Sequence, residues 1–462
     1  MNTLNTRRQF LARMGTAASA LYLGGCGQDE TLLPTPARPD FYLGVGIENT
    51  WMVQADPTKD GPRRPLDEFA LTGHDANWRA DLTLAADLGV NCLRYSLPWP
   101  RVEAAPGVFE FSELRARLEF LVSLGITPIL DLIHYGTPAW MQDGIGDPRF
   151  PESLSRYARA TAEQLGGLVT HFTPYNEPQV AAALCGASGT WPPYAASPQA
   201  FAQLGARVAR AMVLASQRLR EVLPTAVLVS ADPINWLLAD TLFPELAQAE
   251  PEADELRAAV GSFPASLAYG KISTEHPLGA LLMELGVAAT EIDWLLTHAE
   301  PPDIVGYNHY PDIVNYPGSP DFTLGGSVPL ARAATAAARH AEQGLRRAQG
   351  YFGGAIYLSE TSAGLSSSAR AAYATALGEM VERLQIEGFP LVGLNWWPLL
   401  QAVQWDYRDD VAKPLSDFFT PGGWNNALYD LVRKPDGTLQ RVPTPAVAAL
   451  RDLARFVSPP VR

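Results

Sequence analysis

The stretch His171-Phe-Thr-Pro-Tyr-Asn-Glu-Pro178 places a glutamate where a predicted β-strand gives way to a loop. A second β-rich run, Ala355-Ile-Tyr-Leu-Ser-Glu360, also ends in a glutamate. In an α/β barrel the catalytic side chains lie at the carboxyl ends of the strands. Two carboxylates in that position are what glycosidic bond cleavage requires, one to protonate the leaving oxygen and one to attack or support the anomeric carbon. Taken alone, either glutamate is equally well read as a surface residue at the end of a strand.

The rest of the chain alternates short β-rich segments with longer amphipathic helical ones, the order expected for a parallel sheet. Strands are predicted at 41–47, 90–96, 126–133, 169–175, 226–230, 303–308, 355–359 and 391–396. Helices are predicted at 77–88, 112–124, 152–168, 198–222, 330–349, 368–387 and 445–456. The sequence therefore predicts an α/β fold, a single (β/α)8 TIM barrel over residues 41–458.

The fifth unit departs from this rhythm, because a long insertion between Asp232 and Pro302 follows the fifth strand. Long loops after barrel strands commonly build substrate specificity, so we expect this one to form a pocket wall or lid. A separate small domain is the alternative.

Residues 1–25 predict an export signal. Asn5-Thr-Arg-Arg-Gln-Phe-Leu11 has the pattern of a twin-arginine motif, and the apolar run that follows is shorter than the about 20 residues of a membrane-spanning helix. The run ends in Leu23-Gly-Gly-Cys26, which is typical of a lipobox, so Cys26 is the expected lipidation site. The alternative is an ordinary signal peptide in which Cys26 is incidental.

Residues 26–40 are polar and rich in proline, which predicts an extended, lipidated tether. The expected product is an exported, membrane-anchored lipoprotein of a bacterial cell envelope, on its periplasmic or extracellular face. Its expected partners are the twin-arginine export machinery and, through the N-terminal lipid alone, a membrane.

The composition narrows the class of ligand. Loss of the three arginines of the signal takes the formal charge from −14 to about −17, which argues against nucleic acid as a partner. The 11 tryptophans and 16 tyrosines favour a carbohydrate, because sugar rings stack on aromatic side chains. The remaining cysteines, Cys92 and Cys185, are read as two buried thiols, with a disulfide as the alternative.

Further motifs accompany Asn176-Glu177-Pro178 along the predicted barrel. They are Leu93-Arg-Tyr-Ser-Leu-Pro-Trp-Pro-Arg101, Leu132-Ile-His-Tyr-Gly-Thr-Pro138, Gly306-Tyr-Asn-His-Tyr310 and Trp396-Trp-Pro-Leu-Leu-Gln-Ala-Val-Gln-Trp405. Together they resemble glycoside hydrolase family 1, a family of retaining (β/α)8 glycosidases, over most of the barrel.

The resemblance implies a role for each matching residue. Glu177 becomes the acid/base and Glu360 the nucleophile, supported by Arg94 and Tyr310. Arg94 is expected to keep Glu360 ionised and its pKa low. The implied substrate-binding residues are His134, Asn176, Asn308, Trp397, Gln404, Trp405 and Glu48. No metal and no organic cofactor is implied.

Five positions depart from the family. Thr361 and Ser362 follow the nucleophile position where asparagine and glycine are usual, and Gly136 replaces an acidic residue. Gln404 stands where the family has a glutamate that holds the outer hydroxyls of the sugar, and Glu48 is the nearest candidate for a family glutamine. An amide both donates and accepts, so Gln404 is expected to suit a deoxy sugar, a uronate or a sugar with an inverted hydroxyl.

The resemblance therefore implies a retaining glycoside hydrolase that cleaves O-glycosidic bonds, β-glycosides being the expected substrates, by a two-glutamate double displacement. Retention requires carboxyl groups about 5–5.5 Å apart. A transglycosylase would use the same residues. The departures also leave open a non-catalytic sugar-binding lipoprotein, although a pure binder gains nothing from two opposed carboxylates.

Overall fold

The computed structural model describes residues 39–55, 63–235, 238, 254–311, 329–364, 366–419 and 425–457. The chain divides into two units, Met1–Pro34 and Thr35–Arg462, and the described residues all belong to the second. The twin-arginine motif, Cys26 and nearly all of the predicted tether lie outside them. Within the described residues, no helix combines the length and the apolar character needed to cross a membrane.

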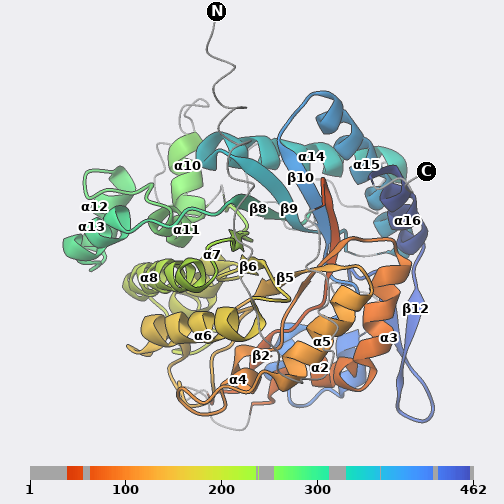
Figure 1. Cartoon of the computed structure of the whole chain (residues 1–462), viewed down its shortest axis with the longest axis horizontal. Coiled ribbons are helices and arrows are strands. Elements are labelled where there is room, and N and C mark those ends of the chain that lie inside the picture. Colours follow the sequence, from red (N-terminus) through yellow and green to blue (C-terminus); the bar gives the residue numbers. More distant parts are fainter. Residues whose placement is uncertain are drawn as a thin grey trace, which may run out of the picture. The chain divides into compact units, whose positions relative to one another are not determined.

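The centre of the second unit is a barrel of eight parallel strands (Figure 1). The strands are β1 (Tyr42–Gly46), β4 (Cys92–Tyr95), β5 (Thr127–Asp131), β6 (His171–Thr173), β7 (Val227–Leu228), β8 (Ile304–His309), β9 (Ala355–Thr361) and β10 (Leu391–Trp396). They pair in the order β7-β6-β5-β4-β1-β10-β9-β8. Parallel bridges from Val229 to Ile304 and from Asp232 to Tyr307 join the two outer strands. The predicted (β/α)8 barrel is confirmed.

The strands read as nearly continuous buried runs because helices cover the outer face and side chains fill the interior. All five residues of β5 are buried, although the strand ends in the charged Asp131. Gly46 is needed at the end of β1, because a Cβ there would lie 1.9 Å from the ring of Trp397. This close approach lets the indole lie across the mouth of the barrel.

The predicted helices are all present, with ends that differ by a few residues. They are α3 (His74–Asp87), α5 (Ser112–Ser123), α6 (Phe150–Leu165), α8 (Pro198–Val222), α14 (Leu330–Phe352), α15 (Ser367–Ile386) and α16 (Ala446–Val457). The start of α8 is set by Ser197, whose hydroxyl accepts from the backbone N–H of Ala200 at 3.1 Å, and by proline at the first helical position.

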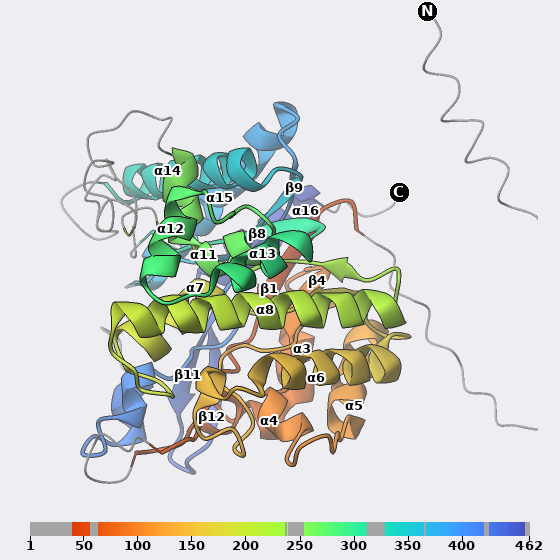
Figure 2. The same ribbon diagram turned by 90° about the vertical axis from the view of Figure 1, so that its left-hand side faces the viewer.

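The described part of the insertion forms α10 (Asp254–Gly261), α11 (Phe263–Ala268), α12 (Pro277–Glu284) and α13 (Ala289–Thr297). Figure 2 shows α8 lying between α6 on one side and α11 and α13 on the other, and α10 packs against α14. The ring of Phe263 lies 4.9 Å from that of Phe201 on α8. These helices therefore complete the outer helical layer between α8 and α14. Trp236 of the insertion lies outside the described residues.

The described part of the insertion lies away from the pocket that Glu177 and Glu360 line. None of its described residues lines that pocket, so the pocket-wall interpretation is wrong for this part of the insertion. Cys92 and Cys185 are both free and buried, as predicted.

Candidate active site

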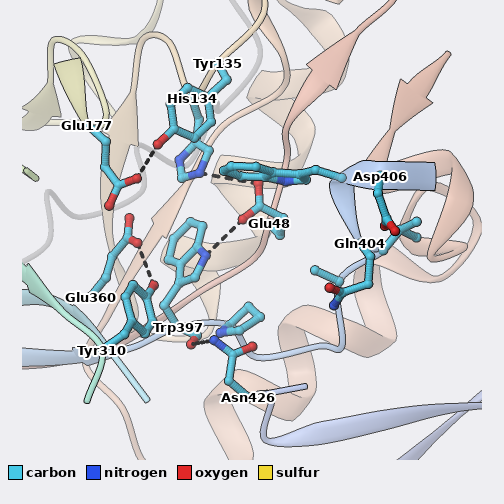
Figure 3. Close-up of a pocket in the computed structure, with 14 residues that line it drawn as sticks. Glu48, His134, Tyr135, Glu177, Tyr310, Glu360, Trp397, Gln404, Asp406 and Asn426 are labelled. Carbon is cyan, nitrogen blue, oxygen red and sulfur yellow. Dashed lines mark hydrogen bonds and ion pairs between the residues drawn. The ribbon is translucent and has the colours of Figure 1, made fainter. Parts of the chain in front are cut away.

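Glu177 and Glu360 meet in one pocket of about 400 Å³ at the carboxyl ends of the strands. Glu177 lies between β6 and α7 (Pro178–Ala182), and Glu360 lies near the end of β9. Figure 3 shows the two carboxyl groups pointing toward one another across the pocket. Glu177 has a left-handed backbone (φ 47°) and its N–H donates to the carbonyl of Ala231 at 2.8 Å. Strained conformations of this kind concentrate at functional sites.

Arg94 is buried next to the pocket and binds three side chains, one of which, Glu360, lines it. Its Nη1 donates to Glu360 Oε1 at 2.6 Å and to the carbonyl of Ser359 at 3.3 Å. Its Nη2 donates to Asp131 Oδ2 at 2.9 Å and to Asn176 Oδ1 at 2.8 Å, and its Nε donates to Asp131 Oδ1 at 3.3 Å. Since every nitrogen of this fully buried guanidinium has a partner, Arg94 fixes Glu360 and Asn176 relative to one another.

The pKa of Glu360 differs from the sequence expectation. Burial has the largest effect and raises the pKa of this carboxyl to about 7, and the charge of Glu177 acts in the same direction. The guanidinium of Arg94 opposes both, as does the hydroxyl of Tyr310, which donates to Glu360 Oε2 at 2.7 Å. Arg94 contacts Glu360 as expected, but it offsets the cost of burial only in part, and the prediction of a low pKa is wrong.

Glu177 is held by two neutral donors from the described residues. Nδ2 of Asn308 donates to Glu177 Oε1 at 2.8 Å, and the hydroxyl of Tyr135 donates to Oε2. Each carboxyl of the pair thus has one oxygen bound by a nitrogen donor and the other by a tyrosine hydroxyl. The nitrogen donor is a cation for Glu360 and a neutral amide for Glu177, so the two positions are chemically distinct.

His134 and Glu48 form a charged pair in the pocket wall next to the two glutamates. Nδ1 of His134 lies 3.1 Å from Asp131 Oδ2, and Nε2 lies 3.4 Å from Glu48 Oε1. Burial alone would lower the pKa of His134, but Glu48 and Asp131 raise it to about 10. Burial opposes ionisation of Glu48 too, yet His134 and the hydrogen bonds from Thr50 and Trp397 lower its pKa to about 2. At neutral pH the pair is therefore an imidazolium and a carboxylate.

Trp397 joins this wall by stacking its indole on the His134 ring, with centroids 4.8 Å apart. Its Nε1 donates to Glu48 Oε2 at 3.1 Å. The segment that follows β10 brings Gln404 and Asp406 to the other side of the pocket (Figure 3). Trp405 also lines the pocket, and its ring lies 5.4 Å from that of Tyr135.

Eight of the eleven barrel residues that the sequence singled out line this pocket: Glu48, His134, Glu177, Tyr310, Glu360, Trp397, Gln404 and Trp405. The other three, Arg94, Asn176 and Asn308, are buried behind it. Arg94 donates to Glu360, Asn308 donates to Glu177, and Asn176 accepts from Arg94. Asn176 Oδ1 is occupied by Arg94, while its Nδ2 lies 3.3 Å from His134 Nε2.

Sequence reasoning missed four residues that belong to the site. Asp131 pairs with Arg94 and His134, and Tyr135, Asp406 and Asn426 line the pocket. A charged residue inside an apolar strand run was a usable signal for Asp131. Tyr135 had a weaker signal, its place directly after His134.

The fold and the two facing glutamates at the strand ends define a barrel with the layout of a carbohydrate-active enzyme. The profile of Glycosyl hydrolase family 1 matches residues 66–313, which is 248 of the 462 residues, and the chain belongs to this family.

Known proteins resemble the chain over different extents. A bifunctional beta-D-glucosidase/beta-D-fucosidase of Bifidobacterium breve is 33% identical over 171 residues, covering 31% of this chain and 36% of that protein. A cyanidin 3-O-glucoside 7-O-glucosyltransferase (acyl-glucose) of Delphinium grandiflorum is 27% identical over 131 residues, covering 26% of this chain and 25% of that protein. The match thus spans only about a third or less of the length of these relatives.

The structural resemblance covers more of the chain. A beta-glucosidase from Thermotoga maritima, solved in complex with azafagomine, superposes with a TM-score of 0.67 at 16% sequence identity, covering 91% of this chain and 99% of that one. At this identity the likeness shows a shared fold.

Proposed function

We propose that the protein is a retaining glycoside hydrolase that cleaves β-glycosidic bonds. The observation that carries the proposal is the facing pair Glu177 and Glu360. The carboxyl of Glu360 binds the Arg94 guanidinium, whereas the side-chain donors to Glu177 among the described residues are all neutral. A cation next to Glu360 favours the anionic form that a nucleophile needs. Glu177 is then the group that carries the exchangeable proton.

In the first step a Glu360 oxygen forms a bond to the anomeric carbon while the bond from that carbon to the leaving oxygen breaks. The proton of Glu177 moves to the leaving oxygen, and Glu177 is left as a carboxylate. In the second step Glu177 takes a proton from water, the water oxygen bonds to the anomeric carbon, and the ester to Glu360 breaks. Two inversions leave the sugar with its original configuration, and both carboxyl groups return to their starting states.

The pocket also bears on the class of sugar. The relative from Bifidobacterium breve is named as both a beta-D-glucosidase and a beta-D-fucosidase, and D-fucose is a 6-deoxy sugar. A neutral or deoxy sugar fits a pocket lined by Glu48, Glu177, Glu360 and Asp406. The positive charge of His134 is already compensated by two carboxylates, so a uronate would meet net repulsion. We therefore retain the deoxy and inverted-hydroxyl sugars and set aside the uronate.

The test is turnover of aryl β-glycosides by the purified protein, with the anomer of the first-formed product read by NMR. Retention with loss of turnover in Glu360→Ala, and formation of the inverted glycosyl azide by that variant on addition of azide, would support the proposal. Release of the inverted sugar would refute the double displacement. Binding without turnover of any glycoside would instead support the sugar-binding lipoprotein.

Transglycosylation is a second candidate, because the relative from Delphinium grandiflorum is named as a glucosyltransferase that uses an acyl-glucose. The same covalent intermediate would then pass to a hydroxyl of an acceptor in place of water. Adding alcohol or sugar acceptors to the assay and measuring the ratio of transfer to hydrolysis distinguishes the two outcomes.

The cell-envelope location is likewise a proposal that rests on the N-terminal sequence. The twin-arginine motif supports export of the folded barrel, and Cys26 at the end of the lipobox-like segment supports anchoring by a lipid.

A further inference from the structure

Both oxygens of Glu177 are engaged, and by donors of different kinds. Nδ2 of Asn308 donates to Oε1 at 2.8 Å. The orientation of this amide is set on its other side, where Ser359 Oγ donates to Asn308 Oδ1 at 2.6 Å. The hydroxyl of Tyr135 donates to Oε2.

These two contacts decide which oxygen carries the catalytic proton. An amide nitrogen can only donate, so Oε1 must accept whether Glu177 is protonated or not. A hydroxyl can donate or accept, so Oε2 keeps a favourable contact with Tyr135 in both states. The proton of the acid therefore belongs on Oε2, the oxygen that Tyr135 touches.

We propose that Tyr135 is a positioning residue of the acid/base, which holds Glu177 Oε2 and directs the proton of that oxygen toward the leaving group. The inference rests on the proposed glycosidase function and deepens it. Tyr135 itself forms no bond to substrate in the reaction, and its own proton stays on its oxygen throughout.

The phenol is held firmly enough for this role. Its ring packs edge-on against His134, with centroids 5.3 Å apart, and against Trp191 and Trp405 at 5.0 and 5.4 Å. The residue is 3% exposed. Burial raises the pKa of Tyr135 well above its usual range, so the hydroxyl stays protonated and able to donate.

The backbone around Tyr135 is also unusual. Tyr135 has φ 57°, and the described part of the chain contains only three residues other than glycine with positive φ, one of which is its partner Glu177 at φ 47°. Gly136 follows with φ 87°, and a Cβ there would lie 1.8 Å from the carbonyl oxygen of Trp51. Two strained residues that touch through their side chains, next to a position that tolerates only glycine, fit a geometry maintained for function.

The contact would act in both chemical steps. As the first step proceeds, the proton leaves Oε2 for the glycosidic oxygen, and the Tyr135 hydroxyl donates to the carboxylate that forms. In the second step a proton from water returns to Oε2 while the water oxygen bonds to the anomeric carbon. Without the hydroxyl, the carboxylate form of Glu177 loses one donor and its Oε2 is free to turn away from the substrate.

Tyr135→Phe removes the hydroxyl and keeps the ring contacts, so it is the informative variant. We expect kcat/KM to fall about 10- to 100-fold for alkyl β-glycosides, whose departure needs a proton, and less than about threefold for dinitrophenyl β-glycosides. The alkaline limb of the kcat/KM profile should move to higher pH, because the proton of the acid is harder to remove. Tyr135→His, which can supply an N–H donor, should recover part of the loss on alkyl substrates.

Equal losses on both classes of substrate, or no loss on either, would overturn the role of Tyr135. The wild-type protein measured in parallel separates the two proposals, since absence of turnover or an inverted product refutes the glycosidase mechanism and not this contact. A second measurement needs no turnover: in a Glu360→Gln background, infrared titration of the Glu177 carboxyl should give a higher midpoint with Tyr135→Phe than with Tyr135. An unchanged midpoint would also overturn the inference.

Discussion

Nη1 of Arg94 lies 2.6 Å from Oε1 of Glu360, yet the pKa of this carboxyl is raised to about 7. The guanidinium is shared, because Asp131 takes its Nη2 at 2.9 Å and its Nε at 3.3 Å. Only part of the positive charge is therefore available to offset the burial of Glu360 and the nearby charge of Glu177. Burial therefore outweighs the ion pair, and the pKa of the attacking group in the proposed mechanism lies above its usual range.

The raised pKa of Glu360 predicts how the activity depends on pH. Because Glu360 must be ionised to attack, kcat/KM on dinitrophenyl β-glycosides should rise with pH through about 7 in the wild type. In Glu177→Gln the like charge is removed, so the rising limb should move to lower pH. The pair titrates as a unit, and the variant separates its members. A wild-type limb below pH 5, or a limb that Glu177→Gln leaves in place, would contradict the assignment.

Glu360→Gln should stabilise the protein at pH 8 while abolishing turnover. The native carboxyl releases its proton near pH 7 and the unfolded one near 4.5, so the native state binds more protons between these values. The contribution of Glu360 to the free energy of unfolding therefore falls as the pH rises from 4.5 to 7. The neutral amide avoids this loss, and we expect a gain of about 3 kcal/mol at pH 8 from denaturant titration.

The control for that measurement is the same pair of proteins at pH 4.5, where the native carboxyl is neutral. The gain should there be largely absent. A gain of equal size at both pH values would show that the difference in stability between glutamate and glutamine at position 360 comes from packing and not from ionisation.

Some elements and site residues could be predicted from the sequence, and others could not. The strand Leu391–Trp396 and the helix Pro198–Val222 were predicted with their observed bounds, because hydrophobic period, proline and capping serine are local signals. The two glutamates were found because each follows a strand. The pKa of Glu360 was mispredicted because it depends first on complete burial of the carboxyl, and then on an Arg94 guanidinium that is shared with Asp131. The Tyr135 contact was missed because it joins two loops 42 residues apart.

Export and anchoring can be tested separately by expressing the full chain in a bacterium. Arg7→Lys with Arg8→Lys should retain the protein in the cytoplasm, because twin-arginine recognition depends on the guanidinium pair. Cys26→Ser should leave export intact and release the barrel from the membrane fraction, as measured by fractionation and by mass spectrometry of the N-terminus. Wild-type protein found soluble outside the cytoplasm without an acyl group would refute the lipobox prediction.

The last prediction concerns Gln404, which lines the pocket across from the charged pair Glu48 and His134. A carboxylate at position 404 would accept charge-assisted hydrogen bonds from two outer hydroxyls of a glucoside, and such bonds are about twice as strong as neutral ones. The amide offers one acceptor and two donors, which suits a sugar that lacks or inverts one of those hydroxyls. Wild-type protein should therefore hydrolyse β-D-fucosides faster than β-D-glucosides.

Gln404→Glu should raise kcat/KM on β-glucosides and lower it on the preferred substrate, with a relative change of about 10-fold, equivalent to one hydrogen bond of about 1.4 kcal/mol. Gln404→Ala is the matched control, because it removes the amide without adding charge and should weaken both substrates. Other carboxylates already line the pocket, so a glutamate at position 404 adds like-charge repulsion. We expect kcat/KM to rise only on glucosides, because only their full set of outer hydroxyls donates enough hydrogen bonds to the new carboxylate. Wild-type protein fastest on plain β-glucosides, and slowed on them by Gln404→Glu, would mean that Gln404 does not select the sugar.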